Sequence, residues 1–281
     1  MNKSVCAPLS KTQIGVYMDG MAVPESTLYN IPLLGKLGVE IDVDRLKDAI
    51  CKAVKAHPGL NTRIFFDENG NVMQQICEDE CCVDVVELSD EQFAAKKEQL
   101  VRPFNLLNSR LYRFEIYKTP LGNYFFQDIH HIIFDGMGLG ILAKDIRKAY
   151  DGEPLRPETY TGIDVALDEM CLRESEAYTS AREYYGRLLD GRDAECLPVR
   201  DVYENEPRQG WITHEFSVDE AVFKALRKEG VSTTAFFTSV MGFLMAKYNY
   251  RSDSVIATIY NGRKNEKTDS TTVPSAFPNS I

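Results

Sequence analysis

The stretch that most constrains the fold of this chain is residues 122–138, with the sequence GNYFFQDIHHIIFDGMG. The aromatic and β-branched residues at positions 124–129 predict a strand that packs on both faces. Apolar residues then recur at helical spacing over positions 139–149, and Gly152 is a typical helix stop signal. The stretch therefore predicts a strand, a tight loop and a helix, with polar side chains held where the strand ends.

Two of the chain's four histidines, His130 and His131, are adjacent at the end of the predicted strand. Neighbouring strand residues point to opposite faces, so we expect one imidazole to face a cavity and the other to be buried and hydrogen-bonded. Asp135 and Gly136 would form the corner beyond the strand, with Gly136 where positive φ or a close backbone approach is needed. A single strand histidine is more often a core residue, but this pair with its Asp-Gly corner favours a functional site.

A metal site is the other chemical interpretation of the two histidines. Adjacent histidines on a strand point apart and do not easily converge on one ion. The sequence also has no second ligand cluster with zinc-like spacing. We therefore expect no metal.

The composition is that of a globular protein and argues against several function classes. The net charge is −10 and the sequence pI about 5.0, without a basic tract, which disfavours a nucleic-acid or anionic-membrane surface. The seven cysteines lack framework spacing and no signal peptide is apparent, so we expect reduced thiols in a cytoplasm. The longest uncharged run, residues 231–246, is shorter than the roughly 20 residues that cross a bilayer, and it predicts a buried helix.

Strands and helices alternate along the chain in a way that predicts an α+β sheet layered with helices. Hairpin turns are expected at residues 67–70 and 119–122, where glycine stands at the turn. Helices are expected at residues 9–20, 44–56, 90–101, 139–151, 165–189, 219–228 and 231–246. Strands are expected at residues 28–41, 60–66, 71–76, 83–86, 111–118, 124–131, 211–216 and 254–260.

The composition changes around residues 151–164, where glycine and proline gather and apolar residues are few, which predicts a linker. Beyond it, a strand, two helices and a strand begin to repeat the order of the first part. We therefore divide the chain into residues 1–160, which carry the double histidine, and residues 161–281.

Residues 130–136, HHIIFDG, resemble the HHxxxDG motif of the condensation domains of non-ribosomal peptide synthetases, within the chloramphenicol acetyltransferase-like superfamily. Further segments are similar to other parts of that family, and the resemblance covers nearly the whole chain. These segments are PLSKTQ at residues 8–13, HPGLNTRIF at 57–65, PFNL at 103–106 with LYRF at 111–114, and NGR at 261–263.

The resemblance implies an α+β, chloramphenicol acetyltransferase-like fold, a two-layer mixed sheet with helices. Residues 1–160 would form one full half and residues 161–281 part of a second, with the active site at their junction. The end of the chain, VPSAFPNSI, resembles the family's Gly-x-Phe-x-Asn-Thr segment, with Pro274 replacing the glycine and Pro278 also unexpected. A complete domain would continue beyond it. We therefore expect a fragment or a degraded gene, inactive alone and prone to self-association through residues beyond about Trp211.

The resemblance also implies roles for the motif residues. His131 matches the catalytic second histidine, acting as a base or by hydrogen bonding, while His130 is structural. Asp135 would be a buried carboxylate paired with an arginine that shapes the loop. Because Asn61 stands where the family has arginine, Arg63 is the first candidate partner and Arg263 a weaker one. The reaction would join a carrier-bound acyl or aminoacyl thioester to a carrier-bound amine.

No cofactor would be bound by the domain itself, because the phosphopantetheine arm arrives with the carrier protein. The implied partners are peptidyl or acyl carrier proteins and neighbouring adenylation domains, with no nucleic acid and no membrane. Heterocyclisation domains are disfavoured because they replace both histidines by aspartate. Epimerisation domains and D- or L-specific condensing domains stay open. The alternatives are a stand-alone acyltransferase using coenzyme A or a carrier thioester, and an inactive synthetase remnant.

Overall fold

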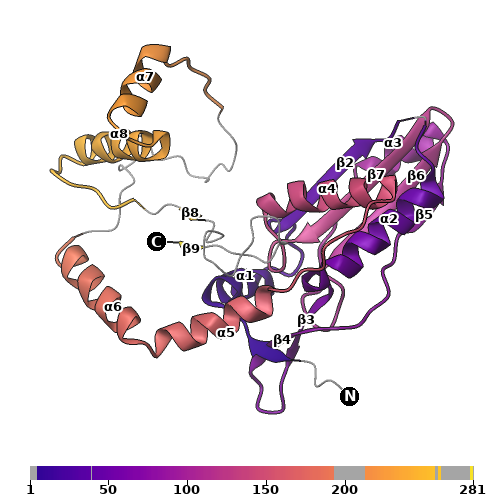
Figure 1. The fold of residues 1–281 in the computed structure, drawn as a ribbon, viewed down its shortest axis with the longest axis horizontal. Coiled ribbons are helices and arrows are strands. Elements are labelled where there is room, and N and C mark those ends of the chain that lie inside the picture. Colours follow the sequence, from indigo (N-terminus) through magenta and orange to yellow (C-terminus); the bar gives the residue numbers. More distant parts are fainter. Residues whose placement is uncertain (1–4, 39, 193–212, 257–258, 261–278, 281) are drawn as a thin grey trace, which may run out of the picture. The chain divides into compact units, whose positions relative to one another are not determined.

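The computed structural model describes residues 5–38, 40–192, 213–256, 259–260 and 279–280 (Figure 1). The chain divides into two compact units, one formed by Met1–Tyr178 with Ile259–Ser280 and the other by Thr179–Thr258. The predicted division into halves at residue 160 stays a prediction. The first compact unit itself continues to Tyr178. Each unit is described by itself below.

The larger sheet of the first unit has four strands in the order β2, β7, β6 and β5. The first three strands pair antiparallel, whereas β5 joins β6 in parallel. Pro32 lacks a backbone N–H and is accommodated because β2 is an edge strand. The bounds are β2 Asn30–Lys36, β5 Asp84–Glu87, β6 Tyr112–Thr119 and β7 Gly122–His130.

Strand β7 lies inside this sheet and carries the double histidine at its end. It is joined to β6 by the predicted hairpin, in which Thr119 pairs with Gly122 and Gly122 has a φ of 149°. Its residues from Phe126 to His130 are all buried. The register with β2 places Asn30 opposite His130. Pairing on both sides therefore fixes where the motif leaves the sheet.

Helices α2 (Val43–Ala56) and α4 (Gly136–Asp151) pack on each other and cover one face of the larger sheet (Figure 1). The Asp42 carboxylate caps α2 by accepting from two backbone N–H groups, and Gly152 ends α4 with a φ of 84°. Their apolar stripes form the main core with residues of β6 and β7. This core includes Leu46, Ile50, Val54, Phe114, Ile116, Ile129, Leu142 and Ile146.

Helix α3 (Asp90–Lys97) covers the opposite face of the same sheet with a smaller cluster. Phe93 packs against Tyr117 and Phe126, and its ring stacks on Tyr124 with the centroids 4.3 Å apart. Helices thus lie on both faces, so β7 is enclosed and its polar side chains must find partners inside the protein.

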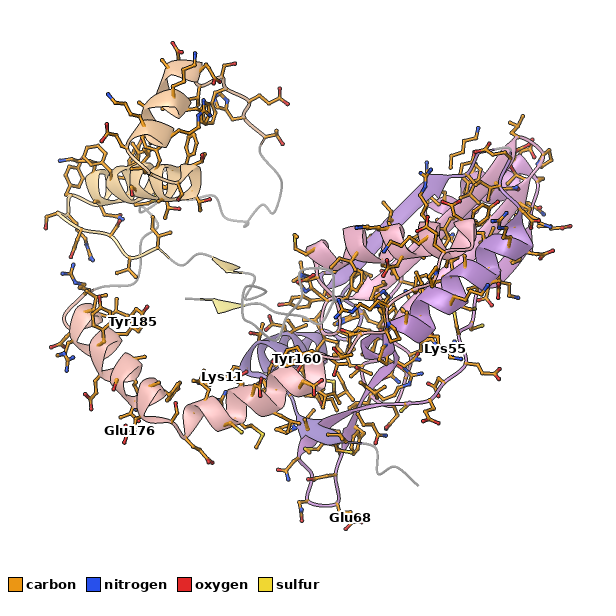
Figure 2. The ribbon with its side chains drawn as sticks, in the orientation of Figure 1. Lys11, Lys55, Glu68, Tyr160, Glu176 and Tyr185 are labelled. Carbon is orange, nitrogen blue, oxygen red and sulfur yellow. The ribbon has the colours of Figure 1, made fainter. Side chains whose placement is uncertain are left out.

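A second sheet in the first unit has the order β1, β4, β3, with all pairs antiparallel. Figure 2 shows Glu68 at the tip of the predicted β3–β4 hairpin, where Gly70 has a φ of 80°. Helix α1 (Lys11–Ala22) follows β1 directly. The other bounds are β1 Cys6–Pro8, β3 Thr62–Phe66, β4 Val72–Ile76 and a short 3₁₀ helix at Pro58–Asn61.

Helix α5 (Gly162–Arg173) packs against β1, which explains why the compact unit extends beyond residue 160. Ile163 and Ala166 are buried against Ala7. Further along the helix, the Lys11 backbone N–H donates to the Glu169 carboxylate, and Lys11 lies beside α5 in Figure 2. Its first turns therefore belong to the core of the first unit.

The second unit contains α7 (Glu220–Lys228) and α8 (Thr233–Tyr248), and α6 (Glu176–Leu189) runs across the division. The prediction that residues 231–246 form a buried helix is correct for the helix and wrong for its burial. Only Ala246 of α8 is buried, and Phe243 is 61% exposed. Among the described residues of this unit, α8 packs on α7 and on the segment around Ser254 and Ile256, which leaves most of its apolar surface uncovered.

The strand predicted at residues 211–216 is wrong for its described part, because residues 213–216 carry no strand. In the described part of the strand predicted at residues 254–260, residues 254–256 carry no strand, and β8 (Ile259–Tyr260) pairs antiparallel with β9 (Asn279–Ser280). The loop predicted at residues 190–210 lies mostly outside the described residues. None of the helices that the structure describes is long and apolar enough to cross a membrane.

Candidate active site

The two histidines are held differently at the end of β7. His130 is the last strand residue and is 6% exposed, whereas His131 begins the turn and is half-buried. The His131 backbone N–H still donates to the Tyr29 carbonyl at 2.8 Å, and the Ile133 N–H turns back to the His130 carbonyl at 3.1 Å. The backbone around His131 is therefore tied to the sheet although its side chain is the more accessible of the two.

The His130 imidazole is buried and neutral. Its Nδ1 accepts a hydrogen bond from the Ile132 N–H at 3.2 Å, which requires that the ring carry its proton on Nε2. The ring lies edge-on to Phe104, with centroids 5.8 Å apart. Burial lowers the pKa of His130 to about 4, helped by the positive charges of Arg113 and a protonated His131. His130 thus shows the buried, hydrogen-bonded environment expected for one member of the pair.

Asp135 caps helix α4 rather than pairing with Arg63. It is half-buried, and its Oδ1 accepts from the Gly138 N–H at 2.9 Å. Gly136 is the first residue of that helix, has no positive φ, and a Cβ there would meet no described atom within 4 Å. The expectation that Gly136 needs positive φ or close approach is therefore wrong, because the helix begins there in ordinary geometry.

Arg63 forms its ion pair with Asp79, in the segment that follows β4. The predicted Arg63–Asp135 pair is wrong, because strand spacing indicated which face Arg63 occupies but not which loop lies against that face. Asn61 is buried nearby, where Tyr112 donates to its Oδ1 at 3.2 Å. Arg263, the weaker candidate, lies outside the described residues.

A buried charged group that sequence reasoning missed lies beside His130. Asp128 is fully buried two residues before His130, on the same face of β7. Its Oδ2 accepts from Arg113 at 2.8 Å and from the Asn30 amide at 2.7 Å. Burial raises the pKa of Asp128, and these two partners oppose that rise. An aspartate in the buried second half of a strand was the sequence signal for such a pair.

Arg113 connects this charged pair to the histidine. Its guanidinium also donates to the Arg102 carbonyl at 2.7 Å and to the Pro103 carbonyl at 2.5 Å. It lies 3.7 Å from the centroid of the Phe104 ring, and that ring also contacts His130 edge-on. Phe104 therefore lies in contact with both the Arg113 guanidinium and the His130 imidazole.

The described residues do not form a metal centre, since no three His, Cys, Asp or Glu gather in them as possible ligands. A cavity of about 850 Å³ lies in the second unit along α8, and its lining includes neither histidine of the motif. The residue best placed for chemistry is thus His131, half-buried in the turn after β7, together with the polar groups that bind the backbone of that turn.

The larger sheet is mixed, carries helices on both faces and leads at one strand end to the double histidine, as the predicted chloramphenicol acetyltransferase-like fold requires. The family model described as "Condensation domain" matches residues 3–277, so the chain belongs to the condensation domain family of non-ribosomal peptide synthetases. Both the predicted family and the predicted fold class are confirmed.

The curated relatives are long synthetases. Surfactin synthase subunit 1 of Bacillus subtilis is 27% identical over 285 residues, which is 98% of this chain and 8% of that protein. Tyrocidine synthase 3 of Brevibacillus parabrevis is 26% identical over 267 residues, covering 91% of this chain and 4% of that protein. The chain thus spans less than a tenth of either relative.

Solved structures show the same fold at low identity. The condensation domain from Monacolin K polyketide synthase matches with a TM-score of 0.78 and 18% identity, over 98% of this chain and 66% of that one. The first condensation domain of the calcium-dependent antibiotic synthetase, solved with a substrate analogue, has a TM-score of 0.72 and 17% identity, over 100% and 69%.

Replacing Asp135 by alanine should lower the free energy of unfolding by about 1 kcal/mol, the usual cost of losing a helix N-cap. Asp135→Asn keeps a capping oxygen and should melt like the wild type. Urea denaturation of the full chain measures both. If Asn destabilises as much as Ala, the carboxylate charge rather than the cap carries the effect.

The buried pair predicts a larger loss. Asp128→Ala should lower the free energy of unfolding by about 3–5 kcal/mol, because Arg113 keeps its charge and loses its partner. Glu87→Ala breaks the exposed Lys118–Glu87 pair on the neighbouring strands and should cost less than about 1 kcal/mol. Equal losses in the two variants, measured by chemical denaturation, would contradict this account.

His130 should make stability depend on pH. Because its folded pKa of about 4 lies below the unfolded value of 6.5, the unfolded chain binds a proton that the folded chain does not. Stability is therefore lost as pH falls from about 6.5 toward 4, by about 2 kcal/mol at pH 5 relative to pH 7.

The variant His130→Asn removes this group and keeps an acceptor for the Ile132 N–H. Denaturation at pH 5 and pH 7 should show a smaller pH effect in this variant than in the wild type. His214→Asn, at an exposed position, is the matched control and should leave the effect unchanged. An unaltered pH effect in His130→Asn would show that His130 is not the group responsible.

Proposed function

We propose that this condensation domain forms an amide bond between a carrier-bound acyl or aminoacyl thioester and a carrier-bound amine, with His131 as the catalytic residue. The observation that carries the proposal is the difference between the two histidines. His130 is buried, neutral and occupied by the Ile132 N–H, while His131 is half-buried on a backbone tied to Tyr29. Of the two, His131 has the side chain that a substrate could reach.

The chemistry suits an imidazole. The amine nitrogen attacks the thioester carbonyl carbon, a C–N bond forms, and the carbonyl oxygen becomes an oxyanion. The C–S bond then breaks, and the proton lost by the amine ends on the departing thiol. His131 would accept that proton, or hydrogen-bond the developing charge, in the interval. The supporting residues in this proposal are His130, which occupies the inner side of the strand end, and Asp135 with Gly136, which begin α4.

The partners proposed are peptidyl or acyl carrier proteins and neighbouring adenylation domains, in line with the synthetases that the chain resembles. The phosphopantetheine arm would arrive on the carrier protein, so the domain itself would need no bound cofactor. We also propose a cytoplasmic location.

A second candidate is a protein-recruiting domain without amide synthesis. The structure titled as the complex of the X-domain and OxyB from teicoplanin biosynthesis matches with a TM-score of 0.78 and 17% identity, over 100% of this chain and 65% of that one. A condensation-type fold is therefore found in a complex with another protein. Product analysis separates the two candidates.

The test supplies the protein with carrier-bound aminoacyl thioesters and detects the dipeptidyl product by mass spectrometry. His131→Ala should lower the rate of product formation by about two to four orders of magnitude, because a positioned base or hydrogen-bond partner is lost. His214→Ala is the control and should react like the wild type. Full activity in His131→Ala would remove His131 as the catalyst, and no product from the wild type would favour the second candidate.

A further inference from the structure

A glutamine at the start of helix α1 is hydrogen-bonded to the turn that carries His131. Gln13 is 3% exposed and belongs to a capping box with Ser10, in which its Oε1 accepts from the Ser10 N–H at 2.9 Å. That contact uses only the oxygen of the Gln13 amide. The two N–H groups on Nε2 are free to bond elsewhere, and both do so inside the protein.

One of these N–H groups binds a second buried glutamine. Gln74, on strand β4, is fully buried and exchanges hydrogen bonds with Gln13 in both directions, at 2.9 Å and 2.8 Å. Its Nε2 also donates to the Pro8 carbonyl at 3.1 Å. The two amides therefore form a closed pair whose orientation is fixed by partners on β1, β4 and α1.

The other N–H group reaches the catalytic loop. Gln13 Nε2 donates to the Ile132 carbonyl at 3.0 Å, on the residue directly after His131. The Ile132 N–H is already bound to His130. Both polar groups of the Ile132 backbone are thus occupied, and the His131 N–H is bound to Tyr29. The backbone on each side of His131 has a fixed partner.

We propose that Gln13, with Gln74 behind it, is a positioning residue for His131. The inference rests on the proposed function for its catalytic meaning. Capping of α1 needs only the Gln13 oxygen, so the hydrogen bond from Gln13 Nε2 to the Ile132 carbonyl is an additional contact, between helix α1 and the turn after β7. This bond fixes the position of the Ile132 backbone and hence the position of the neighbouring His131 residue. A displacement of about 1 Å at a reacting group can cost roughly 100-fold in rate.

The variant Gln13→Glu tests this directly, because it keeps the oxygen that caps Ser10 and replaces the donor by a carboxylate oxygen facing the Ile132 carbonyl. In the dipeptide-forming assay, the kcat of the Gln13→Glu variant should fall by about 10- to 100-fold, with little change in KM for the carrier substrates. Gln75→Ala is the matched control, since Gln75 neighbours Gln74 on β4 but is only half-buried. It should keep wild-type kinetics.

A double-variant cycle separates positioning from general damage. If Gln13 acts through His131, adding Gln13→Glu to His131→Ala should cause little further loss of rate. An equal loss in both backgrounds, or an unchanged kcat in a folded Gln13→Glu protein, would overturn the proposal. Because Gln13→Glu adds a charge to a buried site, Gln13→Met, which removes the donor without adding charge, is measured beside it. A wild-type kcat in folded Gln13→Met would overturn the proposal equally.

Amide hydrogen exchange gives a readout that does not depend on activity. Gln13→Glu should speed exchange at the His131, Ile132 and Ile133 amides while leaving the amides of β7 before Gln127 unchanged. If the wild type forms no amide product, the proposed function fails, yet this exchange pattern still shows whether Gln13 holds the loop. Unchanged exchange at all three amides would show that it does not.

Discussion

Strand β7 ends inside the protein, and the site depends on that constraint. Water does not satisfy polar groups there, so each needs a partner from the chain. Asp128 accepts from Arg113, the His130 Nδ1 accepts from the Ile132 N–H, and the Ile132 carbonyl accepts from Gln13. These bonds restrict the conformation of the strand end and of the turn after it. A half-buried His131 can then have a defined position although its own side chain lies outside the packed interior.

The helices on the two faces of the larger sheet also help to fix the position of β7. Helices α2 and α4 bury one face of the sheet and α3 the other, so the register of β7 between β2 and β6 cannot slip without exposing an apolar face. Helix α4 begins within the motif itself, because Asp135 is its cap. The segment from strand to helix is therefore short, and its backbone is hydrogen-bonded at both ends.

The sequence was informative where local pattern decides structure. The β6–β7 hairpin, the strand that leads to the histidines and the helix up to Gly152 all follow from turn residues and periodicity, and the structure has them, although the strand ends at His130 and His131 begins the turn. The spacing of residues did not identify which side chains form ion pairs with each other. Arg63 was assigned to Asp135 because spacing gives a side chain's face, whereas the loop that brings Asp79 to that face is set by tertiary packing. The uncharged run of α8 likewise predicted an apolar helix, but it could not indicate whether other parts of the chain cover that helix.

The neutral state of His130 has a consequence for the electrostatics of its neighbour. Two adjacent imidazoles would ordinarily compete for protons, because an imidazolium disfavours a second positive charge beside it. Burial beside Tyr29 and Phe104, with Nδ1 bound to the Ile132 N–H, keeps His130 uncharged at neutral pH. The ring beside His131 is therefore uncharged at neutral pH, and His130 adds no positive charge to the end of β7.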